Sequence, residues 1–107
     1  MEQIFNKLVR DRIPEIIVNN GGQAFTRVLD DEEYKKELEK KMIEEYNEAL
    51  NSSGKERIEE LADMIEIIKC LAEVENSSLD EVIEVSKEKC LKRGSFKNKI
   101  FLEKTID

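Results

Sequence analysis

With 107 residues, 39% apolar and 40% charged, the chain suits one small helical domain and is too polar for a broad two-sided sheet. Its net charge of −7 is concentrated in an acidic centre between slightly basic ends, which argues against a nucleic-acid surface because that needs a concentrated basic face. The absence of histidine excludes Ser-His-Asp and Cys-His catalysis, typical zinc sites and the Glu-x-x-His pattern of di-iron bundles. Any acid–base chemistry in this protein would therefore be carried out by carboxylates.

The first predicted element is a short helix around the single proline. Pro14, followed by Glu15 and an apolar run, is typical of a first helical turn, and Asn19-Asn20-Gly21-Gly22 should end the helix. Residues 23–29 alternate weakly between polar and apolar, which predicts a short strand or an extended lead-in.

Two long amphipathic helices are expected next. Apolar residues recur at helical spacing up to about Leu50, and again from near Lys55 to Val74 or Glu75. Asp30 or Asp31 should cap the first of these helices. The turn signal over residues 51–54 predicts that the two helices form an antiparallel hairpin.

A third amphipathic helix should begin at Ser78, which forms a capping-box pattern with Glu81, and end in a basic turn before Gly94. We expect the remaining residues, 95–107, to form an extended tail that packs back on the body through an apolar cluster at 100–102. There is no linker or internal repeat, so residues 1–107 are predicted to form a single all-α domain.

The chain also carries no sign of export or of a membrane span. Cys70 and Cys90 lack a metal-ligand spacing, and we expect both to be buried and reduced. The start lacks the apolar core of a signal peptide, and no apolar run approaches the roughly 18 residues of a spanning helix. These features predict a cytoplasmic protein that binds neither membrane nor nucleic acid.

The hairpin carries the same acidic spacing on both of its helices. Six acids are involved: Glu44, Glu45, Glu48, Glu59, Glu60 and Asp63. At about 100° per residue, Glu45 and Glu60 fall inside the apolar arcs of their helices. Glu48 and Asp63 fall at the edges of these arcs, whereas the other two lie on the outer faces.

A carboxylate in a helix–helix seam costs several kcal/mol unless it is protonated, ion-paired or bound to a metal. Carboxylates from both helices suit Mg²⁺, or alternatively Mn²⁺, because both cations prefer oxygen ligands in octahedral geometry. The other interpretation is a buried ion-pair network in which Lys41, or arginines from elsewhere, neutralise the acids. The wheel favours the metal and leaves the network open.

The paired motif Glu45-x-x-Glu48 and Glu60-x-x-Asp63, in a histidine-free helical chain, resembles the MazG-like all-α nucleoside triphosphate pyrophosphohydrolases, which include phosphoribosyl-ATP pyrophosphohydrolases. The segments KLVRDRIPEII, EELAD and EKCLKRGSF look like a branch of presumed house-cleaning pyrophosphatases. The spacer between the two motifs, residues 49–59, lies at or just below the short end of the superfamily's range. It implies a tight hairpin with little room for inserted substrate-recognition elements.

This resemblance implies Mg²⁺-dependent hydrolysis of a nucleotide between its α and β phosphates, giving a monophosphate and pyrophosphate. Glu45, Glu48, Glu60 and Asp63 would be both the metal ligands and the catalytic residues, with the cation bridging phosphate oxygens and acidifying a bound water. One of these carboxylates, such as Glu45, could take the proton of that water. The substrate would be a non-standard or surplus nucleoside triphosphate, with phosphoribosyl-ATP as the alternative.

A polyphosphate also needs cationic partners, and the basic ends of the chain offer two sets. These candidate substrate-binding residues are Lys7, Arg10 and Arg12 near the start, and Lys89, Lys92 and Arg93 at the end of the last helix. The alternative is that they form solvated surface charge.

The apolar arcs cover more of each long helix than one chain can bury. They predict a homodimer or higher homo-oligomer in which the MazG-like hairpin completes a four-helix bundle, with short extended terminal segments. The same apolar arcs are also compatible with a different class of function, that of a non-catalytic helical binding or assembly module.

Overall fold

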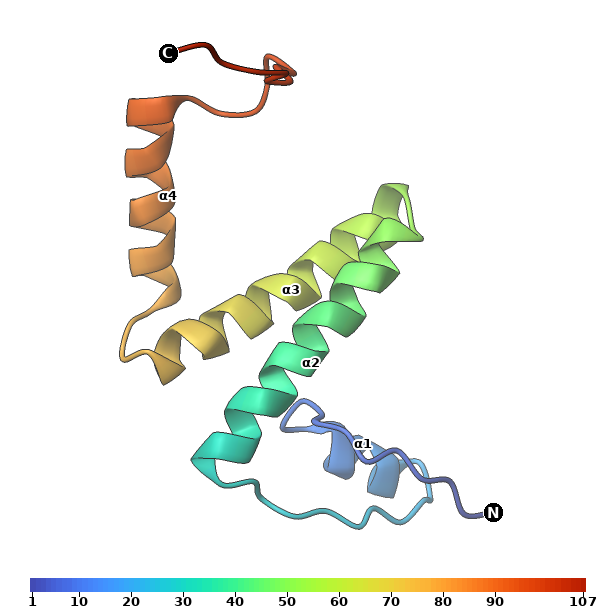
Figure 1. The fold of residues 1–107 in the computed structure, drawn as a ribbon. Coiled ribbons are helices and arrows are strands. Elements are labelled where there is room, and N and C mark those ends of the chain that lie inside the picture. The colour runs from blue at the N-terminus through green and yellow to red at the C-terminus, as the bar shows by residue number, and fades with distance from the viewer.

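The computed structural model describes residues 1–107, which form four α-helices and no strand (Figure 1). The helices are α1 (Ile13–Asn19), α2 (Asp31–Leu50), α3 (Gly54–Val74) and α4 (Leu79–Arg93). The predicted all-α class is confirmed. None of the four helices combines the length and the apolar character needed to cross a membrane.

The helix ends follow the signals in the sequence. The side chain of Asp30 accepts a 2.9 Å hydrogen bond from the backbone N–H of Glu33, and that of Ser78 accepts a 3.1 Å bond from Glu81. Each bond satisfies one of the amide donors that the first turn of a helix leaves free. Pro14 lies in the first turn of α1, as predicted. Residues 23–29 form the extended lead-in, and the alternative of a strand is wrong.

The centre of the molecule is the predicted hairpin of α2 and α3, which lie side by side along much of their length (Figure 1). Its buried apolar residues are Leu38 and Ala49 on α2 and Ile67 and Ala72 on α3. Leu38, Ala49 and Ala72 fall on the apolar arcs predicted from the sequence, and Ile67 falls at the edge of its arc.

The turn of the hairpin is tight because two features close it. Gly54 begins α3 with a φ of 58°, a backbone conformation that residues with a Cβ rarely adopt. The Nε of Arg57 donates hydrogen bonds to the carbonyl oxygens of Ala49, at 3.1 Å, and Ser52, at 3.0 Å. One guanidinium therefore ties the carboxyl end of α2 to the first turn of α3 and fixes how the two helices face each other.

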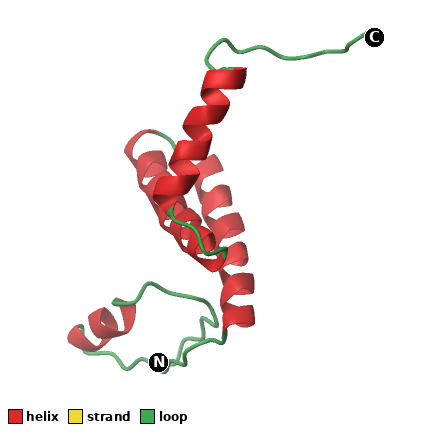
Figure 2. Cartoon of the chain, turned by 90° about the vertical axis from the view of Figure 1, so that its left-hand side faces the viewer, coloured by secondary structure: helices red, strands yellow, loops and turns green.

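Two predictions about the C-terminal part are wrong. α4 diverges from the end of α3 and has no buried residue, so Cys90 is exposed and Cys70 is only half-buried. The tail over residues 95–107 is exposed throughout and extends away from the helices (Figure 2). The apolar cluster at 100–102, which was expected to pack back on the body, is therefore exposed.

The single chain buries little of its apolar surface. Only five of its 107 residues are buried, and its accessible surface is 10105 Å², against about 6,200 Å² for a compact monomer of this mass. The radius of gyration is 18.5 Å, whereas a compact domain of this length has about 13 Å. The wide apolar faces are thus left uncovered within one chain.

Candidate functional site

Three of the four predicted carboxylates converge in the middle of the hairpin. Glu45 from α2 and Glu60 and Asp63 from α3 each place one carboxylate oxygen so that these atoms lie within 4.8 Å of one another. Glu60 and Asp63 are one helical turn apart and so project from the same side of α3. The hairpin brings that side against Glu45, so the two acidic motifs meet although they are separate in sequence.

Glu45 is the buried member of this carboxylate cluster. It is 8% exposed and is the one charged residue among the five buried residues of the chain. Its Oε2 atom has no hydrogen-bond partner, and neither has the buried Oε2 of Glu60. Two ionised carboxylates can only accept hydrogen bonds, so neither can satisfy the other without a proton or a cation between them.

This environment changes the proton affinity of both residues. Burial, followed by hydrogen bonding with Glu60 and the charge of Glu48, raises the pKa of Glu45 to about 7. For Glu60, a hydrogen bond with Glu45 lowers the pKa, but Glu48, burial and Asp63 outweigh it, and the pKa is raised. The pair therefore holds a proton more tightly than isolated carboxylates do.

Glu48 does not belong to the tight group of three, but it lies close enough to raise the pKa of both Glu45 and Glu60. It is itself exposed, at the rim predicted by the wheel. Glu44 and Glu59 do not join the cluster: Glu44 pairs with Lys41 and Lys7, and Glu59 is exposed.

Ion pairs neutralise only the edge of the cluster. Arg10 places its Nη2 atom 2.8 Å from Oδ1 of Asp63, while Lys41 pairs with Glu44 at 4.0 Å. No ion pair of the structure includes Glu45 or Glu60. The predicted ion-pair network is thus present at Asp63 and absent from the buried centre.

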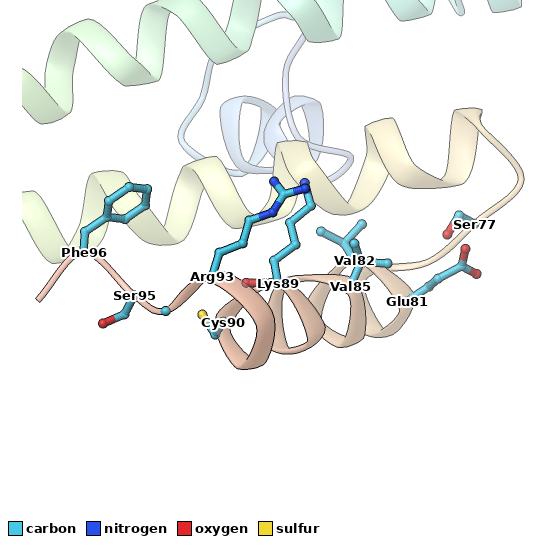
Figure 3. A pocket seen from close by; sticks show the side chains of 11 residues that line it. Ser77, Glu81, Val82, Val85, Lys89, Cys90, Arg93, Ser95 and Phe96 are labelled. Carbon is cyan, nitrogen blue, oxygen red and sulfur yellow. The ribbon is translucent and has the colours of Figure 1, made fainter. Parts of the chain in front are cut away.

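The other candidate basic residues are spread over the chain. Arg12 pairs with Glu15 at 3.2 Å and makes no contact with the cluster. Lys89 and Arg93 line a hollow of about 830 Å³ along α4 and the segment that follows it (Figure 3). Lys92, in the same basic turn, does not line this hollow. The fold of one chain thus does not gather the six basic residues around the carboxylates.

No protein-family model, curated protein or solved structure matches this chain. The resemblance based on the paired acidic motif therefore remains a prediction. The case for a function rests on the geometry of the carboxylates.

That geometry could hold a divalent cation. The donor set consists of carboxylate oxygens only, the ligands that Mg²⁺ and Mn²⁺ prefer, and two of these groups have a buried oxygen without a partner. The contact that sequence reasoning missed is the one between Arg10 and Asp63. The positive charge of Arg10 had suggested a phosphate contact, but no local pattern shows that the segment before α1 reaches α3.

Proposed function

We propose that this protein is a Mg²⁺-dependent nucleotide pyrophosphohydrolase that cleaves a non-standard or surplus nucleoside triphosphate into a monophosphate and pyrophosphate. The observation that carries this proposal is Glu45, a buried carboxylate whose unpartnered oxygen lies in a cluster with Glu60 and Asp63. A buried carboxylate is protonated, ion-paired or bound to a metal, because an unpaired buried charge costs several kcal/mol. The likeness of the acidic motifs to MazG-like enzymes supports the same chemistry.

Glu45, Glu60 and Asp63 would hold the cation, with Glu48 completing the acidic site at its rim. When bound, Mg²⁺ supplies positive charge for the phosphate oxygens and lowers the pKa of coordinated water. The hairpin holds these carboxylates on two packed helices, so their positions are set before a substrate arrives.

Proton transfer also falls to the carboxylates, because the chain contains no histidine. A general base works best when its pKa lies near the working pH. The pKa of Glu45 is about 7 in the metal-free site, and a bound cation would lower it, so any carboxylate of the cluster could take the proton. Lys89 and Arg93 on α4 are the candidates for holding the polyphosphate, and they would reach the cluster only if α4 or a second copy of the chain brings them to it.

The test is pyrophosphate release by the purified chain with Mg²⁺ and a panel of standard and modified nucleotides, including phosphoribosyl-ATP. Glu60→Gln and Asp63→Asn should abolish release, whereas Glu59→Gln, an exposed acid next to Glu60, should retain it. Orthophosphate as the sole product, or full activity in the two site variants, would refute the assignment.

We also propose that the active form is a homodimer or a larger homo-oligomer of this chain. The exposed apolar residues of the hairpin lie on both helices: Ile43, Tyr46 and Leu50 on α2, and Ile58, Leu61 and Ile65 on α3. The surface in excess of a compact monomer is about 3,900 Å² per chain, or about 7,800 Å² for two chains, which exceeds the roughly 2,000–5,000 Å² that obligate homodimers bury in total over both partners. A second copy has a hairpin of the same length and so can complete a four-helix bundle. A monomer in sedimentation at micromolar concentration would contradict this proposal.

A further inference from the structure

The segment before α1 reaches across the acidic face of the hairpin through two ion pairs. Lys7 places its Nζ atom 3.6 Å from Oε1 of Glu44 on α2, and Arg10 places Nη2 2.8 Å from Oδ1 of Asp63 on α3. The residues from Lys7 to Arg10, called the N-terminal arm here, form no helix. The contacts between charged side chains therefore hold the arm against both helices.

Arg10 enters the carboxylate cluster at one member only. Asp63 has a partner, whereas Glu45 and Glu60 each keep a buried oxygen with none. The side chains of Arg10 and Asp63 are 60% and 41% exposed, so water reaches their contact and screens it. Such a pair separates at little cost, and its separation frees an oxygen of Asp63.

A guanidinium and a divalent cation compete for the same carboxylate. Arginine stays protonated at every physiological pH, so Arg10 leaves Asp63 by moving and not by losing its charge. Glu45, Glu60 and Asp63 would hold the cation, which would take the Asp63 oxygen and repel the guanidinium of Arg10.

We propose that Arg10 is the displaceable counter-ion of the carboxylate cluster: it leaves Asp63 when a divalent cation binds and then pairs with a phosphate group of the substrate. The second half rests on the proposed function. The planar guanidinium presents parallel N–H donors that match two phosphate oxygens, a geometry that a lysine lacks. Arg10 is thus a substrate-positioning residue whose availability depends on the metal.

The first half is tested with Mn²⁺ alone, without nucleotide. Arg10→Gln removes the competitor, so the full chain should bind Mn²⁺ about two- to fivefold more tightly in calorimetry, the range expected for an exposed ion pair. Arg27→Gln is the matched control, because Arg27 also forms a 3.0 Å pair with a carboxylate, that of Glu33. Glu33 is separated from Glu45 by about 18 Å of helix, beyond the screening length at physiological salt. Equal or weaker Mn²⁺ binding by Arg10→Gln would overturn the proposal.

Trypsin cleavage after Lys7 gives a readout that is independent of affinity. Mn²⁺ should accelerate this cleavage in the wild-type chain, because displacing Arg10 removes one of the two ion pairs that join the arm to the hairpin. In Arg10→Gln, Mn²⁺ should leave the cleavage rate unchanged. Slower or unchanged cleavage of the wild-type chain on adding Mn²⁺ would show that the cation does not release the arm, contrary to the proposal.

The second half is tested with inorganic pyrophosphate at saturating Mn²⁺. Arg10→Gln should bind pyrophosphate about tenfold more weakly than wild type, and Arg10→Lys should recover only part of the loss. Tighter Mn²⁺ binding with unchanged pyrophosphate binding would overturn the phosphate role. The Mn²⁺ result does not depend on catalysis, so a chain that hydrolyses no nucleotide would refute the proposed function without deciding whether Arg10 competes with the cation.

Discussion

Replacing Glu45 by glutamine should stabilise the metal-free protein at alkaline pH, although the residue is buried. The substitution keeps the size of the side chain, removes its charge and supplies an amide donor for the unpartnered Oε2 of Glu60. When a buried carboxylate is compensated by a partner within the fold, replacing it lowers the stability of the protein. A gain in stability on replacing Glu45 would thus show that the metal-free fold does not neutralise the charge of this residue.

The magnitude follows from the pKa of about 7 in the fold against an ordinary value of 4.5. The folded state holds the proton more tightly, so stability is highest below about pH 4.5 and falls as pH rises toward 7. The ionised group then costs about 3 kcal/mol at pH 8 and about 1 kcal/mol at pH 5. Glu45→Gln should recover most of this difference.

Urea unfolding with a chelator, at fixed protein concentration, measures the effect at both pH values. The control is Glu39→Gln, which removes one exposed charge from the same helix and should change stability by less than about 0.5 kcal/mol. Adding Mg²⁺ should stabilise wild type at pH 8 and should not stabilise Glu45→Gln. A Glu45→Gln variant that is less stable than wild type at pH 8 would refute the reasoning, because it would show that the charge is already compensated.

Two further predictions follow from the same hairpin. Mn²⁺ affinity should fall about tenfold per pH unit below pH 7 and level off above it, because Glu45 must lose its proton to bind a cation. Calorimetry between pH 5.5 and 8 measures this dependence. An affinity that does not change with pH would contradict the prediction. Arg57→Ala should cost about 1–2 kcal/mol in urea unfolding and weaken Mn²⁺ binding, since Arg57 holds the carboxyl end of α2 against α3. Exposed Lys55→Ala, in the same turn of α3, is its control and should leave both quantities unchanged.

The elements that local chemistry determines were predictable from the sequence. Asp30 and Ser78 cap the helices as their spacing indicates, and the hairpin turns where Gly54 allows a positive φ. The burial of Glu45 also followed from its place on the apolar arc of α2. In each case the sequence pattern that determines the feature lies within one or two helical turns of the residue.

Predictions that depended on distant packing were less successful. The tail and Cys90 were expected to be covered because apolar residues in a small domain usually find partners. Helical periodicity tells which face of α4 is apolar, but it does not tell whether the partner of that face lies in the same chain. The accessible surface of 10105 Å² shows only that one chain leaves these faces uncovered.

The contact of Arg10 with Asp63 could not be predicted from the sequence, for a related reason. The two residues are 53 positions apart, and the intervening chain includes an irregular lead-in whose path no periodicity fixes. The contact changes how the cluster is understood. Arg10 shields the edge at Asp63, where water already screens charge, and leaves Glu45 and Glu60 unneutralised where screening is weakest. A network that served stability alone would place its cation at the two unpartnered buried oxygens, so this distribution of charge is the one expected of a site that a mobile cation completes.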